Sequence, residues 1–277
     1  MVQQAAKAAA LRVLHAGKEI LLLPNVWDVA SALLIQESGF KAVATTSAGI
    51  AFSLGYPDGQ VIPRKEMLEA IARIAKAVRV PVTADMEAGY GKTAEDAGRT
   101  ARALLDSGAV GMNLEDADSS GALVELPLQL EKIGAVREMA NRLRIPLVLN
   151  ARTDVYLLQI GAPGKRYDET IRRLTAFRDA GADCVFVPGL QDASTIGRLV
   201  ADVRCPVNIL AGPGSPSVPE LFKLGVARVS LGSAPMRAAL GQLRRIATEV
   251  RTSGTYSNLE DSPTYAEMNL MMDRNRR

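Results

Sequence analysis

The chain has 277 residues, of which 48% are hydrophobic and 23% are charged, as in an ordinary globular protein. Its formal net charge of +3 is small and spread along the chain, so nucleic-acid binding has no support, and no apolar run reaches the length of a membrane span. A single histidine, His15, leaves almost no material for a Ser-His or Cys-His pair or a histidine-bound metal. Acid–base chemistry must therefore use carboxylates, tyrosine, lysine or metal-bound water.

The first 18 residues are rich in alanine and predict a helix. They lack the long apolar core and the cleavage site of a signal peptide. Cys184 and Cys205 each lie in a predicted strand, where buried and unreactive thiols are expected. These features together predict a cytoplasmic protein that binds neither nucleic acid nor membrane.

Short apolar segments alternate with helical patterns along the whole chain. The eight predicted strands cover residues 20–24, 41–46, 80–85, 110–114, 145–150, 183–187, 206–210 and 228–231. Strands that alternate with helices predict a parallel sheet, and eight such units favour a closed (β/α)8 TIM barrel. Glycines recur where helices should end, which indicates a repeated unit. We expect one domain over residues 1–277, with no internal boundary.

The C-terminal segment continues past the eighth predicted unit. A helix is expected at residues 235–251, followed by a Ser-, Gly- and Pro-rich stretch and a short helix at residues 265–272. That short helix carries a stripe of methionine and leucine, which must be buried somewhere. The stripe could pack on its own barrel or on a neighbouring subunit, and the pattern alone favours neither.

Acidic residues follow two neighbouring predicted strands, at the end of a barrel where active sites are built. Asp85 and Glu87 are two residues apart, so on a strand they face the same side, and Glu115 ends the next strand. Three neighbouring carboxylates repel one another unless a cation or protons offset the repulsion. Mg²⁺ prefers such oxygen ligands, and Mn²⁺ would also fit. The alternative is a set of ion pairs with Lys92, Arg152 or other basic residues.

An arginine ends the following strand. Arg152 lies two residues after Asn150, so both side chains should face the barrel interior. A guanidinium at the mouth can bind a carboxylate or phosphonate through two parallel hydrogen bonds. The alternative is an ion pair with Asp154 or Glu115.

Two loops near the mouth add weaker signals. Ser47, Ala48 and Gly49 follow the second strand, and small residues let backbone N–H groups approach an anionic oxygen. Asp58 lies in a Y-P-D-G sequence that is typical of a turn, so an ordinary turn aspartate is the simpler interpretation and an acid of the site the sharper one.

Together these motifs resemble the isocitrate lyase / phosphoenolpyruvate mutase family over nearly the whole chain. The matching motifs, in the family's order, are S-A-G at residues 47–49, L-G-Y-P-D at 54–58, D-M-E-A-G-Y-G at 85–91, L-E-D at 114–116 and A-R-T-D at 151–154. The resemblance implies a barrel whose last helix is exchanged with a neighbouring subunit, usually in a tetramer. It thereby favours a homo-oligomer, dimer or tetramer, in which residues 253–277 pack on the partner.

The resemblance also implies a ligand set. Mg²⁺ would be held by Asp85 directly, and by Glu87 and Glu115 largely through water. The substrate would be a small 2-oxo or 2-hydroxy acid that chelates the metal. Its anionic ends would be held by residues 47–49 and by Arg152, and Asn208 matches an element of the lyase branch that touches substrate.

One loop departs from the family pattern. Isocitrate and methylisocitrate lyases carry K-[KR]-C-G-H after the fourth strand, where the cysteine acts as general acid, and the mutases have a lysine and an asparagine there. Residues 118–127 of this chain read D-S-S-G-A-L-V-E-L-P, without cysteine, histidine, lysine or asparagine. Neither of those two activities follows from the motifs alone.

The sequence therefore predicts a Mg²⁺-dependent carbon–carbon lyase that acts through a metal-stabilised enolate. Decarboxylation of an oxaloacetate-like acid stands slightly ahead of methylisocitrate lyase-like, aldol-type cleavage, because CO₂ leaves without a dedicated acid. Besides Arg152, the candidate catalytic residues are Asp58, Tyr90 and Glu125, together with a metal-bound water. The alternatives are P–C chemistry, as in phosphoenolpyruvate mutase or phosphonopyruvate hydrolase, and a barrel that binds a small acid without turnover.

Overall fold

The computed structural model describes residues 2–274. Its strands are all parallel and neighbour one another in the order β1-β9-β8-β7-β6-β5-β4-β3-β2. They are β1 (Leu21–Leu23), β2 (Asn25–Val26), β3 (Val43–Thr45), β4 (Val82–Asp85), β5 (Gly111–Glu115), β6 (Val148–Arg152), β7 (Cys184–Val187), β8 (Val207–Leu210) and β9 (Arg228–Ser230). Each of the eight predicted strands is present.

The sheet closes into a barrel through its first strand position, which β1 and β2 share. β1 pairs with β9 and β2 pairs with β3, and only Pro24 separates β1 from β2. Proline has no N–H to donate to a ladder, so it divides one rung into two short strands. The nine strands therefore occupy eight positions, which confirms the TIM-type barrel.

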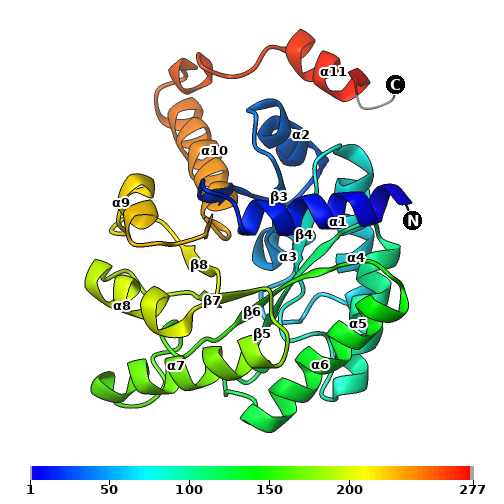
Figure 1. Ribbon diagram of the computed structural model, residues 1–277. Coiled ribbons are helices and arrows are strands. Elements are labelled where there is room, and N and C mark those ends of the chain that lie inside the picture. The colour runs from blue at the N-terminus through cyan, green and yellow to red at the C-terminus, as the bar shows by residue number, and fades with distance from the viewer. Residues whose placement is uncertain (1, 275–277) are drawn as a thin grey trace.

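Helices surround the strands, as Figure 1 shows. They are α1 (Val2–His15), α2 (Val29–Glu37), α3 (Ser47–Ser53), α4 (Arg64–Ala77), α5 (Ala94–Asp106), α6 (Leu126–Arg142), α7 (Pro163–Asp179), α8 (Ala193–Val203), α9 (Val218–Lys223), α10 (Ala234–Thr252), the 3₁₀ turn η1 (Ser257–Leu259) and α11 (Tyr265–Arg274). The predicted glycine caps after four of these helices are left-handed, with φ of 87° at Gly39, 94° at Gly108, 109° at Gly181 and 83° at Gly225.

Helix α1 lies across the N-terminal ends of the strands. Its Gln4 side chain donates to the carbonyls of Leu105 and Ala109, just before β5, and Leu11 packs so close to Gly111 that an added Cβ there would lie 2.9 Å from it. His15 at the end of α1 is buried and lies 3.4 Å from Arg228. Burial, and then the Arg228 charge, lower the pKa of His15 to about 4. The only histidine is therefore a structural residue on the far side from the strand ends that carry the acids.

The interior of the barrel is unusually polar. Arg228 is fully buried and donates to Asn113, whose side-chain oxygen also accepts from Asn150. A barrel of this kind is usually filled by branched apolar side chains. Cys184 is buried beside this network, as expected, and Cys205 is partly buried.

The C-terminal helices leave the barrel. In Figure 1, α10 runs away from the sheet toward α11, which lies beside α2, and α11 contacts α2. Met271 of α11 is buried, and Met268 and Met272 also pack on the core. Met236 is the one buried residue of α10, whereas Leu240, Leu243 and Val250 are exposed. Packing of residues 253–277 on a partner subunit stays a prediction. Among the described residues, no helix has both the length and the apolar character needed to cross a membrane.

Candidate active site

The C-terminal ends of β4, β5 and β6 bring the predicted acids and the arginine to one mouth. Asp85, Glu115 and Arg152 are the last residues of the three strands. Asp85 pairs in register with Asn113, and Glu115 with Arg152, so neighbouring rungs place these side chains next to one another. The spacing in the sequence predicted this arrangement.

Asp85 has one engaged oxygen and one free oxygen. Its Oδ2 accepts from the Ser47 hydroxyl at 2.9 Å and from the Ser47 N–H at 3.4 Å, while its own N–H donates to the Thr45 hydroxyl. Its Oδ1 is buried without a hydrogen-bond partner in the described part of the chain. An orphaned buried carboxylate oxygen is costly unless a cation or a water meets it.

Glu87 reaches the mouth by a different route from the one expected. β4 ends at Asp85, and Glu87 lies in a turn with a left-handed φ of 49° rather than on the strand. Its carboxylate accepts from the Gln60 N–H and, at 3.0 Å, from the Tyr90 hydroxyl. Burial, and then the Asp85 charge, raise the pKa of Glu87 to about 7.

Arg152 is held between two acids. Its Nη1 lies 2.6 Å from Glu115 Oε2, and its Nε donates to Asp154 at 2.6 Å. The guanidinium carbon also lies 5.7 Å from the centre of the Phe186 ring. The ion pairs named as the alternative for Arg152 are therefore present. They also fix the position of the guanidinium, and its charge compensates the two buried carboxylates.

Asp58 joins the same cluster from the loop after α3. Burial, followed by the Asp85 charge, raises the pKa of Asp58, and the Ser47 hydroxyl opposes this shift. Burial, and then the charge and hydrogen bond of Glu87, raise the pKa of Tyr90. One partly buried site thus holds Tyr90 and five acids: Asp58, Asp85, Glu87, Glu115 and Asp154.

The remaining predicted residues lie at different depths. Ser47, Ala48 and Gly49 begin α3 after the N-cap residue Thr46, and all three are buried. Asn208 is fully buried on β8, where it donates to Ser230 and leaves its Oδ1 without a partner. Glu125 is exposed at the start of α6. No contact between Glu125 and the acid cluster is found in residues 2–274.

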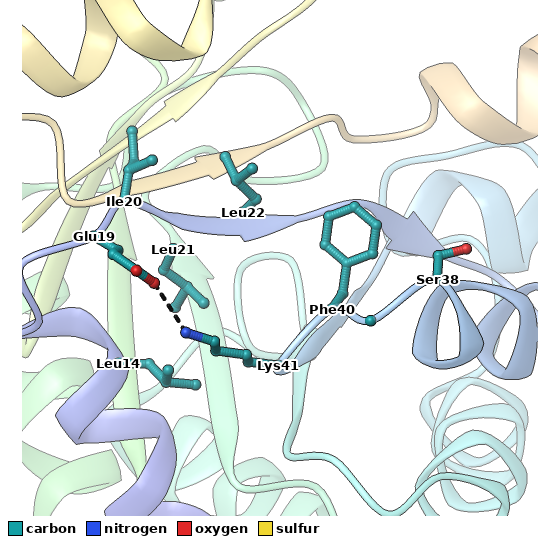
Figure 2. Close-up of a pocket in the computed structure, with 9 residues that line it drawn as sticks. Leu14, Glu19, Ile20, Leu21, Leu22, Ser38, Phe40 and Lys41 are labelled. Carbon is teal, nitrogen blue, oxygen red and sulfur yellow. Dashed lines mark hydrogen bonds and ion pairs between the residues drawn. The ribbon is translucent and has the colours of Figure 1, made fainter.

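Two cavities help to place the site. A cavity of about 780 Å³ lies beside the mouth, between the turn after β4 and the loop before α6, and it is lined in part by Gln60, Tyr90, Lys92, Glu125 and Lys132. The hollow in Figure 2 is smaller, about 260 Å³, and lies outside β1, near the N-terminal ends of the strands. In Figure 2, Ile20 and Leu22 point to one side of β1 and Leu21 to the other, so the hollow faces away from the barrel interior.

Sequence reasoning missed Gln60. Its backbone N–H donates to Glu87, and its side-chain oxygen accepts from the N–H of Tyr90 at 2.8 Å. Gln60 has a left-handed φ of 61° just after the Y-P-D-G turn. Contacts that join a backbone group to a side chain, as both of these do, leave no signature in the spacing of acidic residues.

The donors present fit one divalent cation bound mainly through water. Within residues 2–274, no three Asp, Glu, His or Cys side chains converge as a ready cage for a metal. Mg²⁺ commonly binds one or two carboxylates and keeps several waters. The free Oδ1 of Asp85 suits a direct ligand, and Glu87 and Glu115, engaged by Tyr90 and Arg152, suit contacts through water.

A closed barrel with buried acids, a fixed arginine and small residues at one mouth has the arrangement of an enzyme active site. The comparisons with known proteins name the family. The family model for phosphoenolpyruvate phosphomutase matches residues 11–251, so the chain belongs to this family, within the isocitrate lyase / phosphoenolpyruvate mutase superfamily.

Relatives of the chain include two lyases and a hydrolase. The chain is 31% identical to the 2-methylisocitrate lyase of Bacillus subtilis over 74% of this chain and 66% of that protein. It is 29% identical to the oxaloacetate decarboxylase of Rhodopseudomonas palustris over 84% of this chain and 81% of that protein. It also resembles the solved structure of oxaloacetate acetylhydrolase in complex with the product oxalate, with 29% identity, a TM-score of 0.86, and coverage of 97% of this chain and 94% of the other.

Proposed function

We propose that this protein is a Mg²⁺-dependent carbon–carbon lyase whose substrate is a small 2-oxo or 2-hydroxy dicarboxylic acid, with an oxaloacetate-like acid as the first candidate. The observation that carries the proposal is the orphaned Oδ1 of Asp85, buried beside a guanidinium that two acids hold in place. The similarity to decarboxylases and methylisocitrate lyases supports the substrate class. Mn²⁺ is expected to replace Mg²⁺.

The bound Mg²⁺ would polarise the substrate carbonyl and so stabilise the enolate that remains when the bond breaks. The chain would supply binding and orientation. Asp85 would hold the metal, while Ser47 and the small residues after it would meet the carboxylate beside the carbonyl. Arg152, already oriented by Glu115 and Asp154, would bind the other anionic end.

Proton transfer would fall to the groups around Glu87. The Tyr90 hydroxyl donates a hydrogen bond to Glu87, and the pKa of Tyr90 is raised, so the phenol stays protonated at neutral pH. A protonated phenol can deliver a proton to a developing carbanion. Asp58, whose pKa is also raised, is the second candidate, and Glu125 can take part only from the far side of the mouth cavity.

The test is a turnover assay on the purified protein. A panel of 2-oxo and 2-hydroxy diacids is incubated with Mg²⁺, with Mn²⁺ and with EDTA, and products are followed by proton NMR. We expect turnover of at least one C4 or C5 diacid, its loss in EDTA and its return with added Mg²⁺. Turnover that survives EDTA, or binding without any product, would contradict the proposal.

P–C chemistry is the second candidate, since the matching family model is that of a phosphomutase. Phosphonopyruvate therefore belongs in the same panel, followed by phosphorus NMR. The loop at residues 118–127 lacks the lysine and asparagine that the mutase branch carries, so we expect no change in the phosphorus spectrum.

We also propose that α10 packs on a second copy of this chain, in a dimer or tetramer. The outer helices of a TIM barrel cover its strands, yet α10 runs away from the sheet with Leu240, Leu243 and Val250 exposed. The hollow outside β1 offers Leu14, Ile20 and Leu22 as an apolar counterpart. A cytoplasmic location remains the expectation.

Light scattering tests this assembly. We expect the wild-type chain to be oligomeric at micromolar concentration and Leu243→Asp to shift it toward the monomer, because a buried charge opposes the interface. Val2→Asp is the matched control, since Val2 is exposed at the end of α1 opposite to Leu14 and does not line the hollow. A monomeric wild type, or an equal response of both variants, would count against the exchange of helices.

A further inference from the structure

The turn that carries Glu87 has a costly backbone. Glu87, Gly89 and Tyr90 have φ of 49°, 92° and 53°, so two residues with a Cβ adopt the left-handed conformation within four positions. Such residues cost on the order of 1 kcal/mol or more each and persist only when their surroundings hold them. The holding contacts of this turn therefore decide where the carboxylate of Glu87 lies.

Several groups hold the turn from the side of the mouth or from neighbouring elements. Gln60 contacts both Glu87 and Tyr90, as described above. The N–H of Glu115 donates to the Glu87 carbonyl at 3.0 Å. The Thr100 hydroxyl of α5 donates to the carbonyl of Gly89 at 2.8 Å. The Glu115 and Thr100 contacts each hold one point of the turn, whereas Gln60 holds two from the side of the mouth.

Lys132 also contacts the turn at two places at once. It lies on α6 and is 2% exposed, and its Nζ donates to the carbonyls of Ala88 and Gly91, both at 3.2 Å. The two carbonyls stand on either side of Gly89 and Tyr90, so one ammonium spans the left-handed part of the turn. None of the ion pairs found among the described residues includes Lys132, although Asp96 and Asp118 lie within range of its charge.

A buried ammonium without a paired carboxylate is expensive, so its retention needs a reason. We propose that Lys132 is a positioning residue: from α6 it fixes the turn at residues 87–91, so that Glu87 and Tyr90 face the metal and the substrate. The inference rests on the proposed function. Lys132 itself touches backbone carbonyls and is not a metal ligand.

The experiment compares Lys132→Met with Arg137→Met in the full-length protein. Met keeps the length of the lysine stem without its donors. Arg137 is the matched control because it lies on the same helix but donates to the carbonyls of Leu147 and Gly181 and pairs with Asp183, at the N-terminal ends of the strands. Mg²⁺ affinity is measured by isothermal titration calorimetry, and hydrogen exchange is followed at the amides of residues 88–91.

We expect Lys132→Met to weaken Mg²⁺ binding roughly 10- to 100-fold, the usual effect of removing a group that orients a ligand. Exchange at residues 88–91 should speed up at least tenfold with or without Mg²⁺. Arg137→Met should leave both readouts as in the wild type, whatever it does to thermal stability. Lys132→Gln, which keeps one donor, should fall between wild type and Lys132→Met, and it replaces Lys132→Met if that variant does not fold.

The outcomes separate the two proposals. A wild type that binds no Mg²⁺ would overturn the proposed function, while unchanged exchange in Lys132→Met would overturn the role of Lys132. Wild-type Mg²⁺ affinity in a folded Lys132→Met variant would overturn the inference alone. Equal losses in Lys132→Met and Arg137→Met would reduce Lys132 to a general stabiliser of α6, which also contradicts it.

Discussion

Replacing Asp85 with alanine should lower turnover by about a thousandfold or more while leaving the protein folded. A Lewis-acid metal contributes several kcal/mol to stabilising a developing enolate, and about 4 kcal/mol corresponds to a thousandfold in rate. Asp85 offers the one orphaned carboxylate oxygen among the described acids of the mouth, so its removal should release the metal. Initial rates at saturating substrate and a series of Mg²⁺ concentrations measure the loss.

Stability should move in the opposite direction. Asp85 lies among Asp58, Glu87 and Glu115, and each of these acids has a pKa raised in part by the Asp85 charge. Removing one carboxylate from this cluster relieves electrostatic repulsion, so the melting temperature without metal should stay the same or rise. Asp106→Ala is the matched control, because Asp106 is an exposed acid at the end of α5 that pairs with Arg102 at the surface. Full turnover in Asp85→Ala would contradict the proposal that Asp85 holds the metal.

Replacing Arg173 with methionine should cost about 3 kcal/mol or more of stability. Asp116 follows Glu115 and is fully buried, and Arg173 of α7 lies 3.2 Å from it. Asp116 also accepts from the Thr153 hydroxyl and the Asp154 N–H, so it joins the ends of β5 and β6. Removing one partner of a buried ion pair typically costs 3–5 kcal/mol, because a buried charge is left without compensation.

Urea unfolding at pH 7 tests this expectation, with the neighbouring arginine as control. Arg172 pairs with Glu169 at the surface, so Arg172→Met should cost less than about 1 kcal/mol. Asp116→Asn combined with Arg173→Met should recover much of the loss, since no unpaired charge remains. Similar costs for the two single arginine variants would show that the buried pair contributes little.

The strand positions could be predicted from the sequence because they depend on local pattern. Apolar runs, Gly caps and the alternation with helices all repeat along the chain, and the strand predicted at residues 145–150 differs from β6 by only a few residues. The split of the first rung at Pro24 was not predicted, because it arises from pairing with two different neighbours. Helix α3 was likewise not predicted, because it begins with a run of small residues.

The site was predictable where its residues end strands. Asp85, Glu115 and Arg152 lie where the period of two places them. Glu87 faces the mouth for another reason, since it lies past the strand in a left-handed turn that Gln60 and Lys132 hold. Those two residues come from distant segments, and their contacts with the turn involve backbone N–H and carbonyl groups, which a sequence pattern does not record.

The closed floor of the barrel has a consequence for the order of events. Helix α1 covers the N-terminal ends of the strands, and Arg228 places a fixed positive charge on the axis above it. A divalent ion therefore has to arrive from the same side as the organic acid. Under the proposed function, the metal ion binds before the acid, and the chelated acid then lies between the ion and the solvent. Exchange of the ion should consequently be slowest when the acid is saturating.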